Sequence, residues 1–208
     1  IAGVDEVGRG CLAGPVFAAA VILNDKINKN EIKDSKKISF KKRIILSKYI
    51  KKNSIYAIGM ASVYEIEKIN ILNASLLSMQ RALNKLKVIP NIAYIDGPFA
   101  PKKTKVKCKT FIKGDERVVS IAAASIIAKV FRDQFMSKLA KKYPDYMWDK
   151  NFGYGTKEHL AALKKFGVTT MHRKKFMPVH NILFRWSRET QEDSFFFIRI
   201  WLKYKFRV

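Results

Sequence analysis

Two short apolar runs, separated by a glycine-rich turn, open the chain and constrain its fold more than any other feature. Residues 1–5 form the first run, residues 8–14 contain the glycines, and residues 15–23 form a longer run rich in β-branched side chains. Apolar runs that lie this close together and are joined by glycines predict the two antiparallel strands of a hairpin. The chain therefore begins as part of a β-sheet.

The rest of the chain extends this sheet and adds helices to it. Strand-like segments occur at residues 56–63, 91–95 and 107–112, and helical periodicity occurs at residues 41–52, 73–87, 118–142 and 156–165. The chain has 208 residues, of which 48% are hydrophobic, so it can build one domain with a full core. The order of the segments predicts a mixed α/β sheet with helices packed on it.

Acidic side chains follow three of the predicted strands. Asp5 and Glu6 end the first run, Asp96 ends the strand at residues 91–95, and Asp115 follows the strand at residues 107–112. Carboxylates gathered at strand ends can hold hard divalent cations, which prefer oxygen ligands. Asp next to Gly is also typical of ordinary turns, so the pattern alone leaves both interpretations open. Neighbours in a regular strand point to opposite faces, so Asp5 and Glu6 are expected to share a site only if the strand breaks at Glu6.

The turn after these acids has the chemistry of a phosphate-binding loop. Arg9 lies between Gly8 and Gly10, so main-chain N–H groups and a guanidinium can approach the same phosphate. The formal net charge of +24 favours a polyanionic partner, although the abundance of Lys, Ile, Asn and Phe also fits simple compositional drift. Acids beside a phosphate clamp indicate phosphoryl-transfer chemistry on a nucleic acid.

Composition also sets the expected compartment. Cys11 and Cys108 form neither a disulfide framework nor a metal-site spacing, which is typical of a reducing cytoplasm. The uncharged run at residues 11–23 is too short to span a bilayer, and Gly14 and Pro15 interrupt it. We expect a cytoplasmic monomer that has no membrane partner.

Several motifs, in a fixed order, resemble those of bacterial ribonuclease HII, a member of the type 2 ribonuclease H family. They are A-G-V-D-E-V-G-R-G-C-L-A-G-P-V at 2–16, D-S-K-K at 34–37, I-D-G at 95–97, K-G-D at 113–115, A-A-A-S-I-I-A-K-V-F-R-D at 122–133, G-Y-G-T-K-E-H at 153–159 and H-R-K-K-F-M-P-V at 172–179. The resemblance covers residues 1–183, the expected catalytic domain, and fades over the aromatic, basic tail at residues 184–208. It implies an RNase H-like α/β fold: a mixed five-stranded sheet flanked by helices, with an additional C-terminal helical segment.

The same resemblance implies an activity. Family members hydrolyse RNA in RNA:DNA hybrids and cut on the 5′ side of single ribonucleotides embedded in duplex DNA, leaving 3′-hydroxyl and 5′-phosphate ends. The four catalytic acids of the family match Asp5, Glu6, Asp96 and Asp115, with Asp5 as the central ligand of two Mg²⁺ or Mn²⁺ ions. The sequence does not determine whether a sliding clamp is a further partner.

The resemblance also implies substrate contacts. Gly8, Arg9 and Gly10 match the turn that senses the ribose 2′-hydroxyl, and Tyr154 matches the tyrosine that stacks on the following deoxyribose. The side chains expected to hold phosphates are Lys36, Ser125, Lys129 and Arg132. The last three lie at helical spacing on one face of the helix at residues 118–142, a pattern that a merely solvated face also produces. Asp133, on the same face, is expected to orient Arg132 or to cap local structure.

Two alternatives remain at this stage. Ribonuclease HIII shares the acids but usually carries a lysine in the glycine turn, where this chain has Arg9. A nucleic-acid-binding domain without catalytic activity would explain the positive charge, but it would not need all four acids.

Overall fold

The computed structural model describes residues 1–33 and 39–189 and forms one mixed sheet with strand order β3-β2-β1-β4-β5. The hairpin is present, since β1 (Ala2–Val7) pairs antiparallel with β2 (Val16–Leu23), which pairs antiparallel with β3 (Ser54–Ala61). On the other side, β1 pairs parallel with β4 (Ile92–Asp96), and β4 pairs parallel with β5 (Lys107–Phe111). The predicted mixed five-stranded sheet is confirmed.

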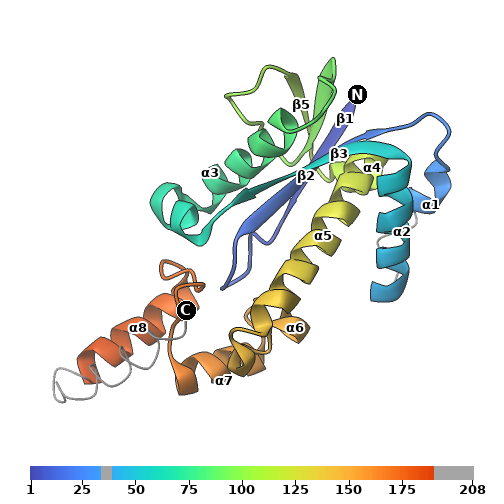
Figure 1. Cartoon of the computed structure of the whole chain (residues 1–208). Helices are drawn as coiled ribbons and strands as arrows, with labels where there is room; N and C mark the ends of the chain where they lie inside the picture. The colour runs from blue at the N-terminus through green and yellow to red at the C-terminus, as the bar shows by residue number, and fades with distance from the viewer. Residues whose placement is uncertain (34–38, 190–208) are drawn as a thin grey trace.

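Helices cover both faces of this sheet (Figure 1). On one face lie α5 (Val119–Ala140) and α2 (Phe40–Lys52), and on the other lies α3 (Val63–Asn84). The strand β2, which lies next to the central strand β1, is buried on both faces, with Ala19 and Val21 toward α5 and Ala18 and Ala20 toward α3. Small side chains in the strands let the helices approach closely. Gly3 is the extreme case, because a Cβ there would collide with the main chain of Ser120 in α5.

A C-terminal group of helices packs at the far end of α5 (Figure 1). It contains α6 (Trp148–Asn151), α7 (Lys157–Phe166) and α8 (Met177–Glu189), and a short 3-10 turn (Pro144–Tyr146) precedes it. Trp148 and Leu163 are fully buried here against Met136 of α5. The helix α8 is the additional C-terminal helical segment, and it continues across the position where the resemblance fades.

The largest difference from the sequence prediction lies at α3. The helix predicted at residues 73–87 begins at Val63, and the preceding strand ends at Ala61 rather than at residue 63. Ser62 caps this helix by accepting the Glu65 N–H, while the Glu65 carboxylate accepts the Ser62 N–H, which forms a capping box. A kink at Asn70, with φ of 64°, separates this added part from the predicted helix.

The remaining elements are short. The helices α1 (Lys29–Lys33) and α4 (Gly114–Arg117) were not predicted, and α4 follows β5 directly. None of the helices in residues 1–33 and 39–189 combines the length and apolar character needed to cross a bilayer.

Candidate active site

The first two acids of the site come from neighbouring strands. Because β1 and β4 are parallel and pair Val4 with Ile95, the next positions, Asp5 and Asp96, lie side by side. Asp5 is buried, with only 5% of its surface exposed. The Asp96 Oδ1 accepts the N–H of Gly114 at 2.7 Å, so the start of α4 is tied to the end of β4. Asp115, the next residue, is half-buried in α4.

The strand β1 does not break at Glu6, which was the condition set for Asp5 and Glu6 to share a site. The ladder with β2 continues regularly through Glu6 and Val7, so Asp5 and Glu6 leave the strand on opposite faces. Their carboxylates nevertheless interact, since the charge of Glu6 helps to raise the pKa of Asp5. Glu6 Oε1 accepts a hydrogen bond from the Arg9 guanidinium at 3.0 Å, whereas its buried Oε2 has no hydrogen-bond partner.

Burial and mutual repulsion make these acids hard to ionise. The pKa of Asp5 is raised well above its usual value, mainly by burial and then by the charges of Glu6 and Asp96, while a hydrogen bond from Ser125 acts in the opposite direction. Burial also raises the pKa of Glu6, and Arg9 opposes that shift. The guanidinium of Arg9 pairs with Glu6, yet the pKa of both acids stays raised. A hard cation with a preference for oxygen ligands would supply further positive charge.

The donor set therefore fits a divalent cation, although the side chains do not form a finished site. Three carboxylates interact, and one buried oxygen of Glu6 is unpartnered. As they stand, however, the described residues include no group of three or more acidic, histidine or cysteine side chains placed to hold a metal ion. Cation binding here would draw the carboxylates closer together, because it removes their repulsion.

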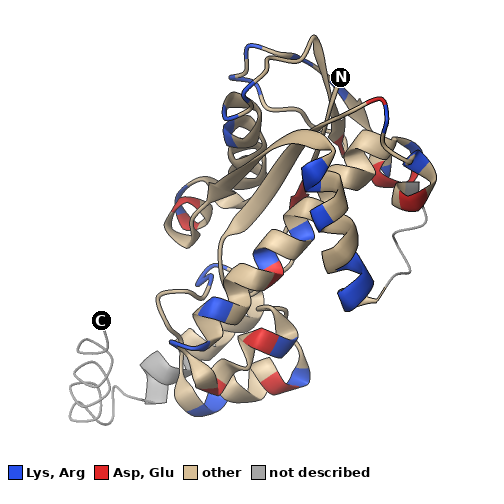
Figure 2. Ribbon diagram, turned by 45° about the vertical axis from the view of Figure 1, so that its right-hand side comes forward, with Lys and Arg blue, Asp and Glu red and all other residues tan. Residues whose placement is uncertain are grey.

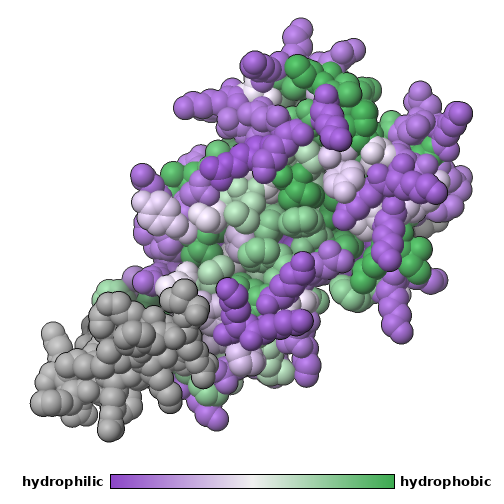
Figure 3. All heavy atoms as spheres, in the orientation of Figure 1, coloured by the Kyte–Doolittle hydropathy of each residue, from purple (hydrophilic) through white to green (hydrophobic). Residues whose placement is uncertain are grey.

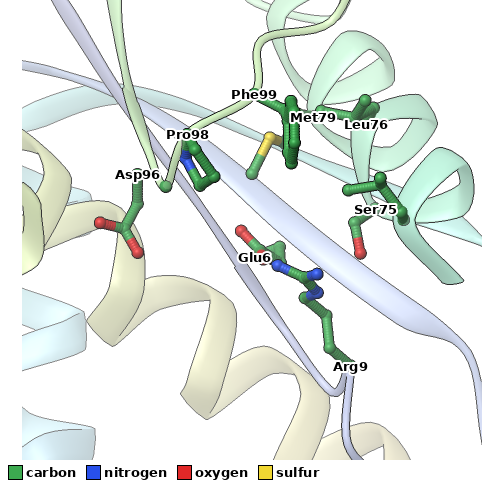
Figure 4. Close-up of a pocket in the computed structure, with 10 residues that line it drawn as sticks. Glu6, Arg9, Ser75, Leu76, Met79, Asp96, Pro98 and Phe99 are labelled. Atoms are coloured by element: carbon green, nitrogen blue, oxygen red, sulfur yellow. Dashed lines mark hydrogen bonds and ion pairs between the residues drawn. The ribbon is translucent and has the colours of Figure 1, made fainter. Parts of the chain in front are cut away.

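A pocket opens beside Glu6 on the α3 side of the sheet (Figure 4). Glu6, Arg9 and Asp96 line its polar side, and the guanidinium of Arg9 lies beside the Glu6 carboxylate. The rest of the lining comes from α3 and from the segment after β4: Leu72, Ser75, Leu76, Met79, Gly97, Pro98 and Phe99. The side chain of Arg9 is 48% exposed, so it can also reach a ligand in solvent.

The buried Arg173, to which no role was assigned from the sequence, holds the glycine turn. Arg173 has no exposed surface, and its guanidinium donates to Gly8 O at 2.6 Å, to Arg9 O at 2.8 Å and to Gly14 O at 2.8 and 3.0 Å. These carbonyls therefore face inward, and Arg9 and Gly10 stay exposed. Arg173 lies in the motif at 172–179, but only the fold reveals that it contacts a turn more than 150 residues earlier in the sequence.

Arg132 does not hold a phosphate, contrary to expectation. It is fully buried, and its guanidinium donates to Pro15 O at 3.2 Å, Phe152 O at 2.8 Å and Ala13 O at 3.0 Å. All of its nitrogens are engaged by main-chain carbonyls, so neither solvent nor substrate reaches it. From its place in α5, Arg132 thus holds the main chain of Ala13 and Pro15 together with that of Phe152.

Ser125 and Lys129 remain on the site side of α5, with different partners from those expected. The Ser125 hydroxyl faces Asp5 and acts to lower the pKa of that carboxyl. Lys129 Nζ lies 2.7 Å from Asp133 Oδ1 and stands over the rings of Phe152 and Tyr154. Asp133, 1% exposed, therefore pairs with Lys129 rather than with Arg132.

Two buried histidines stabilise the segment that carries Tyr154. The Thr169 N–H donates to His172 Nδ1 at 3.0 Å, which leaves the proton of His172 on Nε2, 3.1 Å from His159 Nε2. His159 Nδ1 in turn donates to Tyr154 O at 2.8 Å, and Trp148 donates to His159 Nε2 at 3.0 Å. Burial lowers the pKa of both histidines, that of His172 to about 3, so both are neutral. They support the tyrosine segment rather than exchange protons.

The surroundings of the site are basic. Figure 2 shows lysines and arginines along α5 and on the first turn of α2, and Figure 3 shows hydrophilic side chains projecting around hydrophobic surface on one face. Lys36, which was expected to contact phosphate, lies outside the described residues, as does most of the tail at residues 184–208.

Comparisons with known proteins agree with this architecture. A protein family described as Ribonuclease HII matches residues 2–179. A Ribonuclease HII of Pelagibacter ubique is 60% identical over 183 residues, which is 88% of this chain and 98% of that protein. The RNase HII in a solved complex with PCNA from Archaeoglobus fulgidus superposes with a TM-score of 0.74 at 28% identity, covering 87% of this chain and 95% of that one.

A structure of Bst-RNase HIII in complex with Mn²⁺ shares only the fold, with a TM-score of 0.69 at 18% identity over 90% of this chain and 70% of that chain. The resemblance to ribonuclease HII, rather than to HIII, is thus confirmed. The alternative of a nucleic-acid-binding domain without catalytic activity is set aside, because the relatives are hydrolases. The chain belongs to the ribonuclease HII family of endoribonucleases.

Proposed function

We propose that this endoribonuclease hydrolyses the phosphodiester on the 5′ side of ribonucleotides, both in RNA:DNA hybrids and at single ribonucleotides in duplex DNA. The products are a 3′-hydroxyl and a 5′-phosphate. The observation that carries the proposal is the set of interacting carboxylates of Asp5, Glu6 and Asp96, beside the exposed guanidinium of Arg9. This arrangement offers oxygen ligands and a phosphate contact at one place.

The cofactors in this proposal are two Mg²⁺ or Mn²⁺ ions held by Asp5, Glu6, Asp96 and Asp115. When bound, such ions stabilise the negative charge on the attacking and leaving oxygens of an in-line displacement. Asp5 is the central ligand, and the Ser125 hydroxyl orients its carboxylate. The Gly114 N–H fixes Asp96 and thereby the start of α4, which carries Asp115.

Selection of ribose is assigned to the glycine turn and to Tyr154. The 2′-hydroxyl is the only group that distinguishes the two sugars at this position. Because Arg173 binds the turn carbonyls, Gly8, Arg9 and Gly10 are free to present their N–H groups to the 2′-hydroxyl and the adjacent phosphates. Tyr154, 39% exposed, packs on the next deoxyribose, where a further hydroxyl fits less well.

Phosphate contacts are assigned to Arg9, Lys36 and Lys129. The ammonium of Lys129 is held by Asp133 but is not fully covered, since its side chain is 27% exposed. It can therefore pair with a substrate phosphate while it stays over the Tyr154 ring.

The test is cleavage of a DNA duplex that carries one ribonucleotide, with Mg²⁺ or Mn²⁺ and with a chelator, followed by mapping of the product ends. We expect one cut 5′ of the ribonucleotide with either metal, none with chelator and none in an all-DNA duplex. Asp5→Asn should abolish the cut and leave duplex binding nearly unchanged. Cleavage of RNA:DNA hybrids without cleavage at the single ribonucleotide would contradict the proposed selectivity, and absence of any product would contradict the activity.

A further inference from the structure

A row of contacts joins Tyr154 to Phe40 by way of Lys129 and Phe152. Lys129 Nζ lies 5.6 Å from the ring centroid of Tyr154 and 4.9 Å from that of Phe152. The Phe152 ring is in turn stacked with Phe40, with centroids 6.3 Å apart and an interplanar angle of 21°. Phe40 is the first residue of α2 and is 46% exposed. The row of contacts therefore joins Tyr154 to a large apolar side chain at the surface.

The charge around Phe40 is entirely positive within its helix turn. Lys41 and Lys42 follow it and are exposed, and no acidic residue occurs in the first turn of α2 (Figure 2). Cations near a helix N-terminus oppose the helix dipole, so they do not stabilise α2 itself. The positive charge of Arg43, the next residue, acts to lower the pKa of Asp133. The first turn of α2 therefore lies beside the Lys129–Asp133 pair of α5.

We infer that Phe40 is a further substrate-contacting residue, whose ring packs against a sugar of the duplex flank on the 3′ side of the ribonucleotide. The inference rests on the proposed function, because it extends the contact assigned to Tyr154. A duplex presents phosphates to Lys41 and Lys42 and the apolar edges of its sugars to the ring. Such interleaving of cations and aromatic side chains is how proteins bind nucleic acid strands without reading bases.

The geometry limits where this contact falls. Each of the three steps from Tyr154 to Phe40 is between 4.9 and 6.3 Å. With a rise of about 3.4 Å per nucleotide along one strand, Phe40 lies within about five nucleotides of the sugar on Tyr154. A duplex whose 3′ flank ends before the nucleotide that Phe40 contacts cannot reach the ring.

The experiment measures binding of duplexes that carry one ribonucleotide, by fluorescence anisotropy with chelator present to prevent cleavage. The 3′ flank is shortened in steps from about ten nucleotides to about one, and the 5′ flank is kept constant. Phe40→Ala should raise the Kd three- to tenfold for the long flank, equivalent to about 0.7–1.4 kcal/mol for a half-exposed ring. For the shortest flank, the variant and the wild type should bind equally.

Two further variants separate a contact from a general effect. Phe40→Trp keeps an aromatic ring and should restore binding of the long flank. Tyr64→Ala removes a ring that is 72% exposed on α3, across the sheet from α2, and should change nothing. Thermal unfolding of each variant reports whether α2 is intact.

Two results would overturn the inference: an equal Kd for Phe40→Ala and wild type with the long flank, or a loss that persists with the shortest flank. Either would mean that something other than the 3′ flank covers Phe40. Failure of the proposed function is seen separately, as a wild-type protein that binds these duplexes no better than all-DNA duplexes.

Discussion

Replacing Arg173 by methionine should destabilise the protein and loosen the glycine turn. Methionine is apolar and of comparable length, so it fills much of the same buried space but donates no hydrogen bonds. The change removes the donors to Gly8 O, Arg9 O and Gly14 O. Gly8 and Gly14 are buried, so their carbonyls would have no water to replace the guanidinium, whereas Arg9 is exposed.

The expected loss in free energy of unfolding follows from the two buried carbonyls. An unsatisfied buried acceptor costs about 1–3 kcal/mol, so two of them cost about 2–6 kcal/mol. Part of this is offset because burial of the guanidinium is itself unfavourable: it lowers the pKa of Arg173 to about 10. We therefore expect the free energy of unfolding to fall by about 2–4 kcal/mol.

Urea unfolding followed by circular dichroism measures this loss. Arg117→Met, at an exposed position, is the matched control and should change the free energy of unfolding by less than about 0.5 kcal/mol. Arg173→Lys keeps the charge but not the planar set of donors, so it should lie between the wild type and Arg173→Met. A loss below about 1 kcal/mol for Arg173→Met would refute the view that this arginine holds the turn.

Three further changes test the electrostatics of the structure. With chelator present, Asp5→Asn should raise the free energy of unfolding at neutral pH. Because the pKa of Asp5 is higher in the folded protein than in the unfolded chain, the wild type loses stability as the pH rises from the unfolded pKa to the folded pKa, and asparagine avoids this loss. An unchanged or lower free energy of unfolding would contradict the burial of the Asp5 carboxylate. Arg81 is the main cause that lowers the pKa of Glu65 to about 2. Ionised Glu65 should therefore stabilise the protein fully above about pH 4.5, and this stabilisation should be lost as the pH falls toward 2. In acid unfolding of Glu65→Gln, the loss of stability between these pH values should be smaller than in the wild type. Arg9→Ala should reduce the preference for ribonucleotide-containing over all-DNA duplexes in competition binding, and an undiminished preference would remove Arg9 from the junction contacts.

Most of the fold could be predicted because its elements have simple local causes. The hairpin and the strands ending at Asp96 and Phe111 follow from apolar runs bounded by turn residues, and α5 follows from an alanine-rich apolar face. The first half of α3 was not predicted, and its first residue, the β-branched Val63, was assigned to the preceding strand. The capping box of Ser62 and Glu65 was the available signal for a helix start at that position.

The site was harder to predict, because its support comes from contacts that are distant in the sequence. A helical face with Ser125, Lys129 and Arg132 was correct as a pattern, but the pattern could not show that Arg132 points into the space beneath Gly8. The same limit applies to Arg173, which lies more than 150 residues from the turn that it holds. Strand neighbours such as Asp5 and Glu6 also interact more closely than alternation of faces suggests.

The central claim is that acids from β1, β4 and α4 jointly bind divalent cations. Calorimetric titration with Mn²⁺ tests it directly, comparing the wild type with Asp5→Asn, Asp96→Asn and Asp115→Asn, and with Asp149→Asn as an exposed control. We predict binding to the wild type and to the control, and affinity reduced more than about tenfold in each of the other three variants. Wild-type affinity in Asp5→Asn and Asp96→Asn would contradict the account.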